Sequence, residues 1–294
     1  MSGYEKINFR NGKELQALCG SRALPISEIM LLRECSLSEK SRGSVLARMG
    51  HVWEIMKDSA HSPIDSPKKS MGGLIGGEAQ ALFLHRAKGK TVCGDLMSRS
   101  ITYAMAVLEV NASMGLIVAA PTAGSSGIVP GVLLALQEEY DLADEPVVRV
   151  LFNAGSIGYL AMRNATVAGA VGGCQAEVGV ASAMAASAAV ELMGGTPDQC
   201  LSAASTVLMN MLGLVCDPIG GLVEAPCQGR NAAGAANALT AAELSLSGVH
   251  QPIPFDEMLD AMYTVGKRLP SELRETAQGG CAATPTACSL CGGC

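Results

Sequence analysis

The stretch from Val178 to Leu192 constrains the fold most, because the helix that it predicts carries Ala, Ser, Met, Val and Gly on every face. A helix at a protein surface shows a polar side, so a helix of this composition is expected to lie among other helices. Aromatic residues make up only 3% of the chain, so the packing around this helix must rely on small and flexible side chains. The sequence therefore predicts a buried central helix inside a closely packed helical domain.

Helical periodicity extends over most of the remaining chain. The clearest run covers residues 37–59, where apolar side chains between Val45 and Met56 share one face, and Ser36 with Glu39 forms a capping-box pattern. Alternation of period two is almost absent, and the best strand candidate, Val147 to Phe152, can equally begin a buried helix. We therefore predict the all-α fold class. Further helices are expected at about 79–88, 95–113, 127–140, 156–166, 177–195, 198–214, 229–247 and 255–268.

One segment suggests a boundary within the chain. Residues from Pro63 to Gly77 are rich in Pro, Ser, Lys and Gly, which predicts a loop. The expected organisation is an N-terminal helical segment at 1–62, a single helical domain at 63–280 that holds the central helix, and a cysteine-rich tail at 281–294.

The overall balance of residues excludes two classes of partner. The net charge is −6 and no run of Lys and Arg exceeds a pair, so a nucleic-acid partner is not expected. The most apolar stretch, Gly115 to Leu136, is interrupted by two prolines and lacks the roughly 18 apolar residues of a membrane span. The chain opens without an apolar export signal, so we predict a soluble cytoplasmic protein whose thiols stay reduced.

Eleven cysteines in a cytoplasmic chain favour metal binding or catalysis over disulfides. Cys174 follows two glycines and precedes the central helix, whose N-terminal partial charge stabilises a thiolate. Cys216 and Cys227 flank the segment Asp217–Gly221, whose Pro and Gly residues predict a loop. Two interpretations stay open: three thiolates on an iron–sulfur cluster with one iron left free, or three buried free cysteines that fill small gaps.

The tail holds a second group of cysteines, Cys281, Cys288, Cys291 and Cys294. The last three have the spacing of a ferredoxin ligand run, but the fourth cysteine and its following proline are missing. The tail can therefore be a separate metal site, a segment that presents one thiolate to an iron elsewhere, or a redox-labile end.

Two glycine-containing segments, Gly72–Gly77 and Pro121–Gly127, are candidate ligand-binding loops. Gly72–Gly77 lacks the Gly-Lys-Ser/Thr ending of a phosphate-binding loop and no strand precedes it, so phosphate binding is not expected. Pro121–Gly127 precedes a helix that begins near Ile128, and its hydroxyls and N–H groups can hold a small anion such as a carboxylate. The alternative for the second segment is an ordinary helix start.

Several long motifs in this order resemble the α chain of the bacterial iron–sulfur-dependent L-serine dehydratases, or L-serine ammonia-lyases. They cover most of residues 70–280. The matching segments are Gly72–Ala79, Asn111–Gly127, Gly172–Gly179, Gly213–Pro218, Gly221–Asn231 and Leu273–Gly280.

The resemblance implies an all-helical catalytic domain that deaminates L-serine to pyruvate and ammonia without pyridoxal phosphate. It implies a [4Fe–4S] cluster on Cys174, Cys216 and Cys227, with Cys294 as a tail ligand that substrate displaces. It also implies a separate β chain, to which residues 1–62 are candidates to dock. The catalytic base is not assigned, because neither of the histidines His61 and His85 has a supporting partner in the sequence, and the base can belong to the β chain.

Within this resemblance, the substrate residues are expected on two loops. Thr122, Gly124, Ser125 and Ser126 would hold the carboxylate of serine, and Lys68 or Ser70 would help to orient it. Two rival functions stay open: an L-cysteine desulfidase of the same fold, and a non-catalytic iron–sulfur redox sensor.

Overall fold

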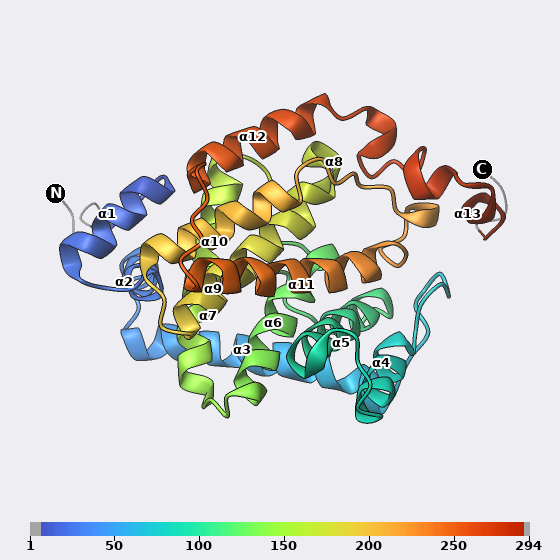
Figure 1. Cartoon of the computed structure of the whole chain (residues 1–294), viewed down its shortest axis with the longest axis horizontal. Helices are drawn as coiled ribbons and strands as arrows, with labels where there is room; N and C mark the ends of the chain where they lie inside the picture. Colours follow the sequence, from blue (N-terminus) through green and yellow to red (C-terminus); the bar gives the residue numbers. More distant parts are fainter. Residues whose placement is uncertain (1–6, 291–294) are drawn as a thin grey trace.

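The computed structural model describes residues 7–290, which form thirteen α-helices joined by turns and longer loops (Figure 1). Within this range there is no β-strand, and Cys216 and Arg274 form an isolated bridge. The predicted all-α fold class is therefore confirmed. The helices are α1 (Gly12–Arg22), α2 (Ile26–Ser38), α3 (Arg42–Asp65), α4 (Glu78–Ala87), α5 (Gly94–Ala112), α6 (Ile128–Glu139), α7 (Asp144–Asn164), α8 (Gly169–Gly172), α9 (Val180–Leu192), α10 (Pro197–Asn210), α11 (Cys227–Leu246), α12 (Phe255–Arg268) and α13 (Pro285–Leu290).

Helix α9 is the predicted central helix. Every residue from Val180 to Val190 is buried, and the helix packs against α6, α7, α10 and α11. Small residues permit this close approach: a Cβ at Gly234 of α11 would lie 2.7 Å from the side chain of Ile128 on α6. A π-helical turn, Gln175–Gly179, leads into α9 and carries the chain from Cys174 to the core.

The N-terminal part of the chain differs from the prediction. Ser36 is not a helix cap but lies inside α2, and α3 begins only after Ser41, whose side chain accepts a hydrogen bond from the Ser44 N–H. Glu39 ends α2 in the left-handed region at φ 53°. The helix predicted at 37–59 therefore begins too early, because neither Gly nor Pro marks the break between α2 and α3.

The structure also differs from two other predicted element boundaries. The strand candidate Val147–Phe152 lies inside α7, which packs between α9 on one side and α2 and α3 on the other. Burial on both sides makes the run continuously apolar, so it lacks the polar face of a surface helix. The predicted loop at Pro63 starts later, because α3 continues to Asp65 with Pro63 in its last turn.

Residues before the predicted boundary share the main core with the rest of the molecule. Phe9, Leu15 and Trp53 are fully buried in the same apolar cluster as α9. The indole N–H of Trp53 also donates to Asp144 Oδ1 at 3.0 Å, which ties α3 to the start of α7. Among the described helices, none combines the length and the apolar character needed to cross a membrane.

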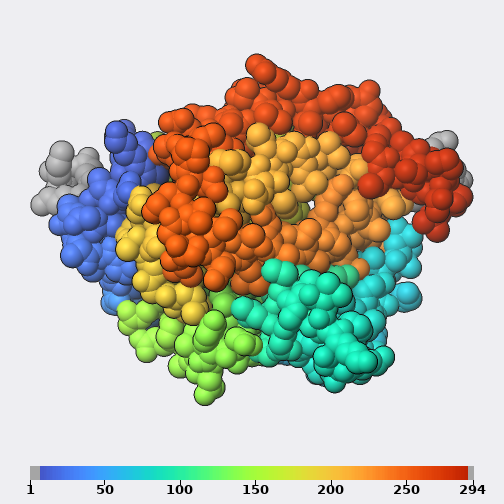
Figure 2. All heavy atoms as spheres, in the orientation of Figure 1, coloured from blue at the N-terminus to red at the C-terminus, as the bar shows by residue number. Residues whose placement is uncertain are grey.

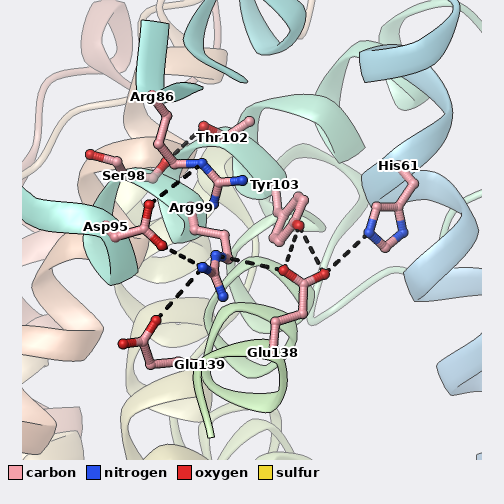
Figure 3. A network of polar contacts seen from close by, with 9 residues as sticks. All are labelled: His61, Arg86, Asp95, Ser98, Arg99, Thr102, Tyr103, Glu138 and Glu139. Carbon is pink, nitrogen blue, oxygen red and sulfur yellow. Dashed lines mark hydrogen bonds and ion pairs between the residues drawn. The ribbon is translucent and has the colours of Figure 1, made fainter. Parts of the chain in front are cut away.

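A network of charged and polar side chains joins α3, α4, α5 and α6 on one side of the molecule (Figure 3). Tyr103 donates to both oxygens of Glu138, at 2.9 and 2.8 Å. His61 approaches the same carboxylate, with 3.4 Å between Nε2 and Oε1, and Arg99 lies on its other side. The carboxylate of Glu138 therefore links three helices.

The C-terminal segments extend along one edge of the molecule to the end where α13 lies (Figure 1). Helix α12 runs along one edge, and α13 packs against the short 3-10 turn Ile219–Gly221 (Figures 1 and 2). That turn belongs to the loop between Cys216 and Cys227. The end of the described chain therefore contacts the loop that carries two of the predicted ligands.

Candidate metal centre

The three predicted ligand cysteines come from three different elements and face one cavity. Cys174 precedes the π-helical turn, Cys216 lies in the loop after α10, and Cys227 is the first residue of α11. All three are buried and free of disulfides. They line a cavity of about 10 Å³ together with Gly124 and Glu177.

Backbone geometry explains why glycines surround these cysteines. A Cβ at Gly173 would lie 2.8 Å from the Leu214 carbonyl oxygen, and its φ of +74° also favours glycine. A Cβ at Gly169 would lie 2.6 Å from Glu177 Oε2 and 3.0 Å from Cys216 Sγ. A side chain at Gly169 or Gly173 would therefore push apart the segments that carry Cys174 and Cys216.

The loop that holds Cys216 is fixed by the C-terminal segment. The Cys216 N–H donates to the Leu273 carbonyl at 2.9 Å, and the Glu275 N–H donates to the Cys216 carbonyl at 2.7 Å. The cysteine is therefore held by backbone hydrogen bonds on both sides. This explains why the motif at Leu273–Gly280 accompanies the cysteine motifs.

Glu177 is a site residue that the sequence interpretation missed. One oxygen of its carboxylate and the sulfurs of Cys174 and Cys216 all lie within 4.8 Å of one another, so this set could hold a metal ion. Thr122 Oγ1 donates to Glu177 Oε1 at 2.8 Å. Burial raises the pKa of Glu177, although the Thr122 hydrogen bond acts in the opposite direction. The sequence does contain one sign of this role, because residues three apart on a helical turn lie on the same face, as Glu177 and Cys174 do.

Arg230 supplies positive charge beside the thiols. Its Nη1 lies 3.5 Å from Cys174 Sγ, 2.9 Å from the Val215 carbonyl oxygen and 2.6 Å from Asp217 Oδ1. A hydrogen bond with Cys216, opposed by burial and aided by Arg230, lowers the pKa of Cys174. Arg230 and Cys216 therefore stabilise the thiolate form of Cys174 relative to its thiol.

The other two thiols are held in their neutral form. The hydrogen bond to Cys174, together with burial, raises the pKa of Cys216. Burial raises the pKa of Cys227 to about 12. A bound cation would reverse this preference, because metal coordination deprotonates thiols.

The predicted anion-binding turn lies at the edge of this cavity. Gly124 lines the cavity, while the Thr122 hydroxyl donates to Glu177 and lies 3.0 Å from Ser125 Oγ. The Ser126 hydroxyl donates to the Ala123 carbonyl. Asn231, which sequence spacing did not single out, fixes the turn by donating to the Gly124 carbonyl at 2.8 Å and to the Cys227 carbonyl at 3.0 Å.

The loop of residues 66–77, here called the glycine loop, contacts the segment between Cys216 and Cys227 through Glu224. Glu224 is another residue that the sequence interpretation missed. Glu224 is buried between Cys216 and Cys227 and accepts from the Ser70 hydroxyl and the Gly72 N–H, both at 2.6 Å, and from the Leu74 N–H at 3.0 Å. The Ser70 hydroxyl is therefore engaged with Glu224. Lys68 is exposed, and neither Lys68 nor Ser70 lines the cavity.

The tail was predicted to present Cys294, which lies outside the described residues. Within them, the Cys281 N–H donates to Asp217 Oδ2 at 2.6 Å. A Cβ at Gly280 would lie only 2.1 Å from the same oxygen. The start of the tail is therefore anchored beside the carboxylate that also pairs with Arg230.

The donor set fits an iron–sulfur cluster, since three thiols converge and thiolates are the ligands that such clusters prefer. The cavity between them is small, because about 10 Å³ is roughly the space for one water molecule. The loops that carry Cys216 and Cys227 would therefore have to move outward when a four-iron cluster binds.

Comparisons with known proteins identify the family of the chain. The family model "Serine dehydratase alpha chain" matches residues 21–282. The chain is 47% identical to the probable L-serine dehydratase, alpha chain, of Bacillus subtilis (strain 168), over 95% of this chain and 92% of that protein. It is 42% identical to the L-serine dehydratase, alpha chain, of Peptoniphilus asaccharolyticus, over 93% of this chain and 94% of that protein.

A longer relative covers the same region. L-serine dehydratase TdcG of Escherichia coli (strain K12) is 35% identical over 94% of this chain, but over only 62% of its own length. The chain therefore belongs to the serine dehydratase alpha chain family of enzymes, and the resemblance inferred from its motifs is confirmed.

Proposed function

We propose that this chain is the catalytic α subunit of an iron–sulfur L-serine dehydratase, which converts L-serine to pyruvate and ammonia. The observation that carries the proposal is the convergence of Cys174, Cys216 and Cys227 on one buried cavity in a chain of this family. The three cysteines would hold a [4Fe–4S] cluster. When bound, such a cluster supplies a Lewis acid at the iron that lacks a cysteine ligand.

The residues around the cavity have separate tasks in this proposal. Arg230 offsets the negative charge of the thiolates, and Asn231 keeps the 122–127 turn next to Cys227. Thr122, Gly124, Ser125 and Ser126 belong to that turn and would receive the carboxylate of serine. The substrate would thereby be oriented with its hydroxyl toward the cysteines.

The glycine loop has a supporting task. Ser70 would act through Glu224, because its hydroxyl donates to that carboxylate, whereas the exposed Lys68 remains free to attract the anionic end of the substrate. Loss of the α-proton and the β-hydroxyl of L-serine as water would give an enamine, which tautomerises to an imine. Water then hydrolyses the imine to pyruvate and ammonia. A Lewis acid that assists the departure of the hydroxyl would take the place of pyridoxal phosphate.

A separate β chain would complete the enzyme. The names of the relatives as alpha chains support a partner, and over a third of the length of the E. coli relative lies outside the part that this chain matches. The described residues that line the cavity include carboxylates but no histidine. We therefore propose that the β chain supplies the base and that residues 1–62 take part in docking it.

The test is pyruvate formation from L-serine after anaerobic reconstitution with iron and sulfide. The protein is assayed with and without the β chain, and L-cysteine is supplied as a competing substrate. We expect pyruvate from L-serine that requires the cluster and is highest with both chains. A stable cluster that yields no pyruvate, with or without the β chain, would contradict the proposal. Turnover of L-cysteine to sulfide without turnover of L-serine would reassign the chain as a desulfidase.

A further inference from the structure

The cavity between the cysteines has the size and the donors of a site for one metal ion. Its volume is about 10 Å³, which is too small for four irons. Cys216 Sγ lies 4.0 Å from Glu177 Oε2, and the three ligand atoms from Cys174, Glu177 and Cys216 lie within 4.8 Å of one another. The cluster-free protein thus already holds two thiols and one carboxylate around a shared point.

We propose that the cluster-free chain binds a single divalent transition-metal ion of the zinc type through Cys174, Glu177 and Cys216. The site overlaps the one in the proposed function, so its biological meaning rests on that function. The binding event itself does not, because it requires neither the cluster nor the substrate. Cys227 borders the same cavity but lies outside this set of three ligands, so a water molecule would complete a four-coordinate ion.

The distances suit such an ion closely. Zinc–sulfur bonds of about 2.3 Å and zinc–oxygen bonds of about 2.1 Å place tetrahedral ligands roughly 3.6–3.8 Å apart. The ligand atoms of Cys174, Glu177 and Cys216 need to approach by at most about 1 Å from their present separations to meet that geometry. Opening the site for a cluster requires a movement in the opposite direction.

The surrounding residues support a metal ligand at Glu177. Thr122 donates to Oε1 at 2.8 Å, so this bond fixes the carboxylate while Oε2 points toward Cys216. Gly169 leaves room for both ligands, because any Cβ there would lie 2.6 Å from Oε2 and 3.0 Å from the sulfur. Hydrogen bonds of this kind orient metal ligands and are typically worth 10- to 100-fold in affinity.

Binding at this site would have a consequence for assembly of the enzyme. Each thiol that coordinates the ion releases a proton and is no longer free for iron. A zinc-loaded chain would therefore hold two of the three cysteines that the cluster needs. Zinc would act as an inhibitor of cluster loading, without oxidising or cleaving the protein.

Cobalt(II) is the probe for the test, since its spectrum reports both coordination number and thiolate ligands. The full chain, freed of iron and kept anaerobic, is titrated with cobalt(II) and then with zinc(II). We expect one equivalent of cobalt, visible bands of a four-coordinate ion and a thiolate charge-transfer band, all removed by zinc. Zinc-loaded protein should then fail to take up iron on reconstitution.

Three variants and a control assign the ligands. In Cys174→Ser and Cys216→Ser, the charge-transfer band should become weaker and cobalt should bind less tightly. Glu177→Gln removes a direct ligand, so it should weaken binding by more than the roughly 10- to 100-fold that loss of an outer-shell hydrogen bond costs. Cys93→Ser is the control, because Cys93 is an exposed free cysteine that does not line this cavity. Unchanged cobalt affinity and spectrum in Glu177→Gln would overturn the proposal.

X-ray absorption of the zinc-loaded wild type gives a second measurement that depends on no variant. A mixed shell of sulfur and oxygen is expected, whereas a shell of sulfur alone would remove Glu177 from the site. The two proposals separate cleanly. Absence of cobalt binding in a chain that produces pyruvate after reconstitution overturns only the single-ion site, and cobalt binding in a chain that never produces pyruvate overturns only the dehydratase function.

Discussion

Arg230 shows at the level of single residues how the site balances buried charge. Its guanidinium lies between Cys174 and Asp217, and Asp217 is only 2% exposed. A buried carboxylate without a partner is costly, so the arginine is needed whether or not a metal is present. The same cation offsets thiolate charge when the cysteines lose their protons.

Replacing Arg230 by glutamine is expected to destabilise the cluster-free chain by about 3 kcal/mol, because Asp217 would keep its charge without a cation beside it. Arg149→Gln is the matched control, since Arg149 pairs with the exposed Glu145 one helical turn away. That change should alter stability by less than about 0.5 kcal/mol. Urea denaturation of both variants under anaerobic conditions measures the difference, and equal effects would contradict this account of Arg230.

At the scale of elements, the glycine loop is held in place by Glu224. Three donors from Ser70, Gly72 and Leu74 converge on this one carboxylate. A Cβ at Gly72 would lie 2.9 Å from Glu224 Oε1, so this glycine permits the close approach. Glu224 thereby joins a loop of residues 66–77 to the segment between two ligand cysteines.

The change Glu224→Gln is expected to loosen this loop. The amide of glutamine would direct an N–H toward the backbone donors of Gly72 and Leu74. The loop would thereby lose charge-assisted hydrogen bonds worth about 2 kcal/mol. Trypsin cleavage after Lys68 and Lys69, both exposed in the loop, should then become roughly 30-fold faster, the factor that about 2 kcal/mol corresponds to. Mass spectrometry of the fragments measures the rate, with Glu145→Gln as the surface control. An unchanged cleavage rate would show that Glu224 does not restrain the loop.

The network on α3, α5 and α6 predicts a pH dependence of stability. A hydrogen bond to Glu138 raises the pKa of the half-exposed His61 above its ordinary value of 6.5. Although burial acts the other way, hydrogen bonds from His61 and Tyr103 lower the pKa of Glu138. A raised histidine pKa stabilises the fold fully below 6.5, and this contribution disappears as the pH rises through the folded-state value.

Unfolding midpoints should therefore fall slightly as the pH rises from 6.5 through the folded-state pKa of His61. The His61→Gln variant should lack this decline. The effect is expected to stay below about 1 kcal/mol, because the pair is partly open to solvent. A wild-type decline that persists unchanged in His61→Gln would assign it to another group.

For the whole molecule, the sequence predicted the architecture well and the environment of the site only in part. Periodicity and composition identified the buried helix α9, because burial on all sides leaves a local compositional mark. The break between α2 and α3 was missed, since Glu39 adopts a left-handed turn without glycine. Glu224 and Arg230 were missed as site residues because their partners lie far away in the sequence. Glu177 was missed although its spacing from Cys174 was visible, because a carboxylate on a helical turn is more often a solvated side chain than a ligand.

The cysteines illustrate the same limit. Glycine and proline around Cys174, Cys216 and Cys227 indicated loops, but spacing alone could not separate ligands from buried free thiols. Their shared cavity depends on the π-helical turn before α9, the start of α11 and the C-terminal segment Leu273–Glu275 coming together. Such a meeting point is a property of the tertiary fold, which periodicity does not encode.

In the proposed function, Cys174, Cys216 and Cys227 would hold a cluster that supplies a Lewis acid for elimination on L-serine. The most direct test follows iron content and pyruvate formation in the same reconstituted sample during stepwise exposure to air. An iron with an open coordination position is accessible to oxygen, so iron and activity should be lost together and return together after anaerobic reconstitution. Pyruvate formation that continues after the iron has gone, or that survives in a Cys174→Ser, Cys216→Ser and Cys227→Ser triple variant, would contradict the account.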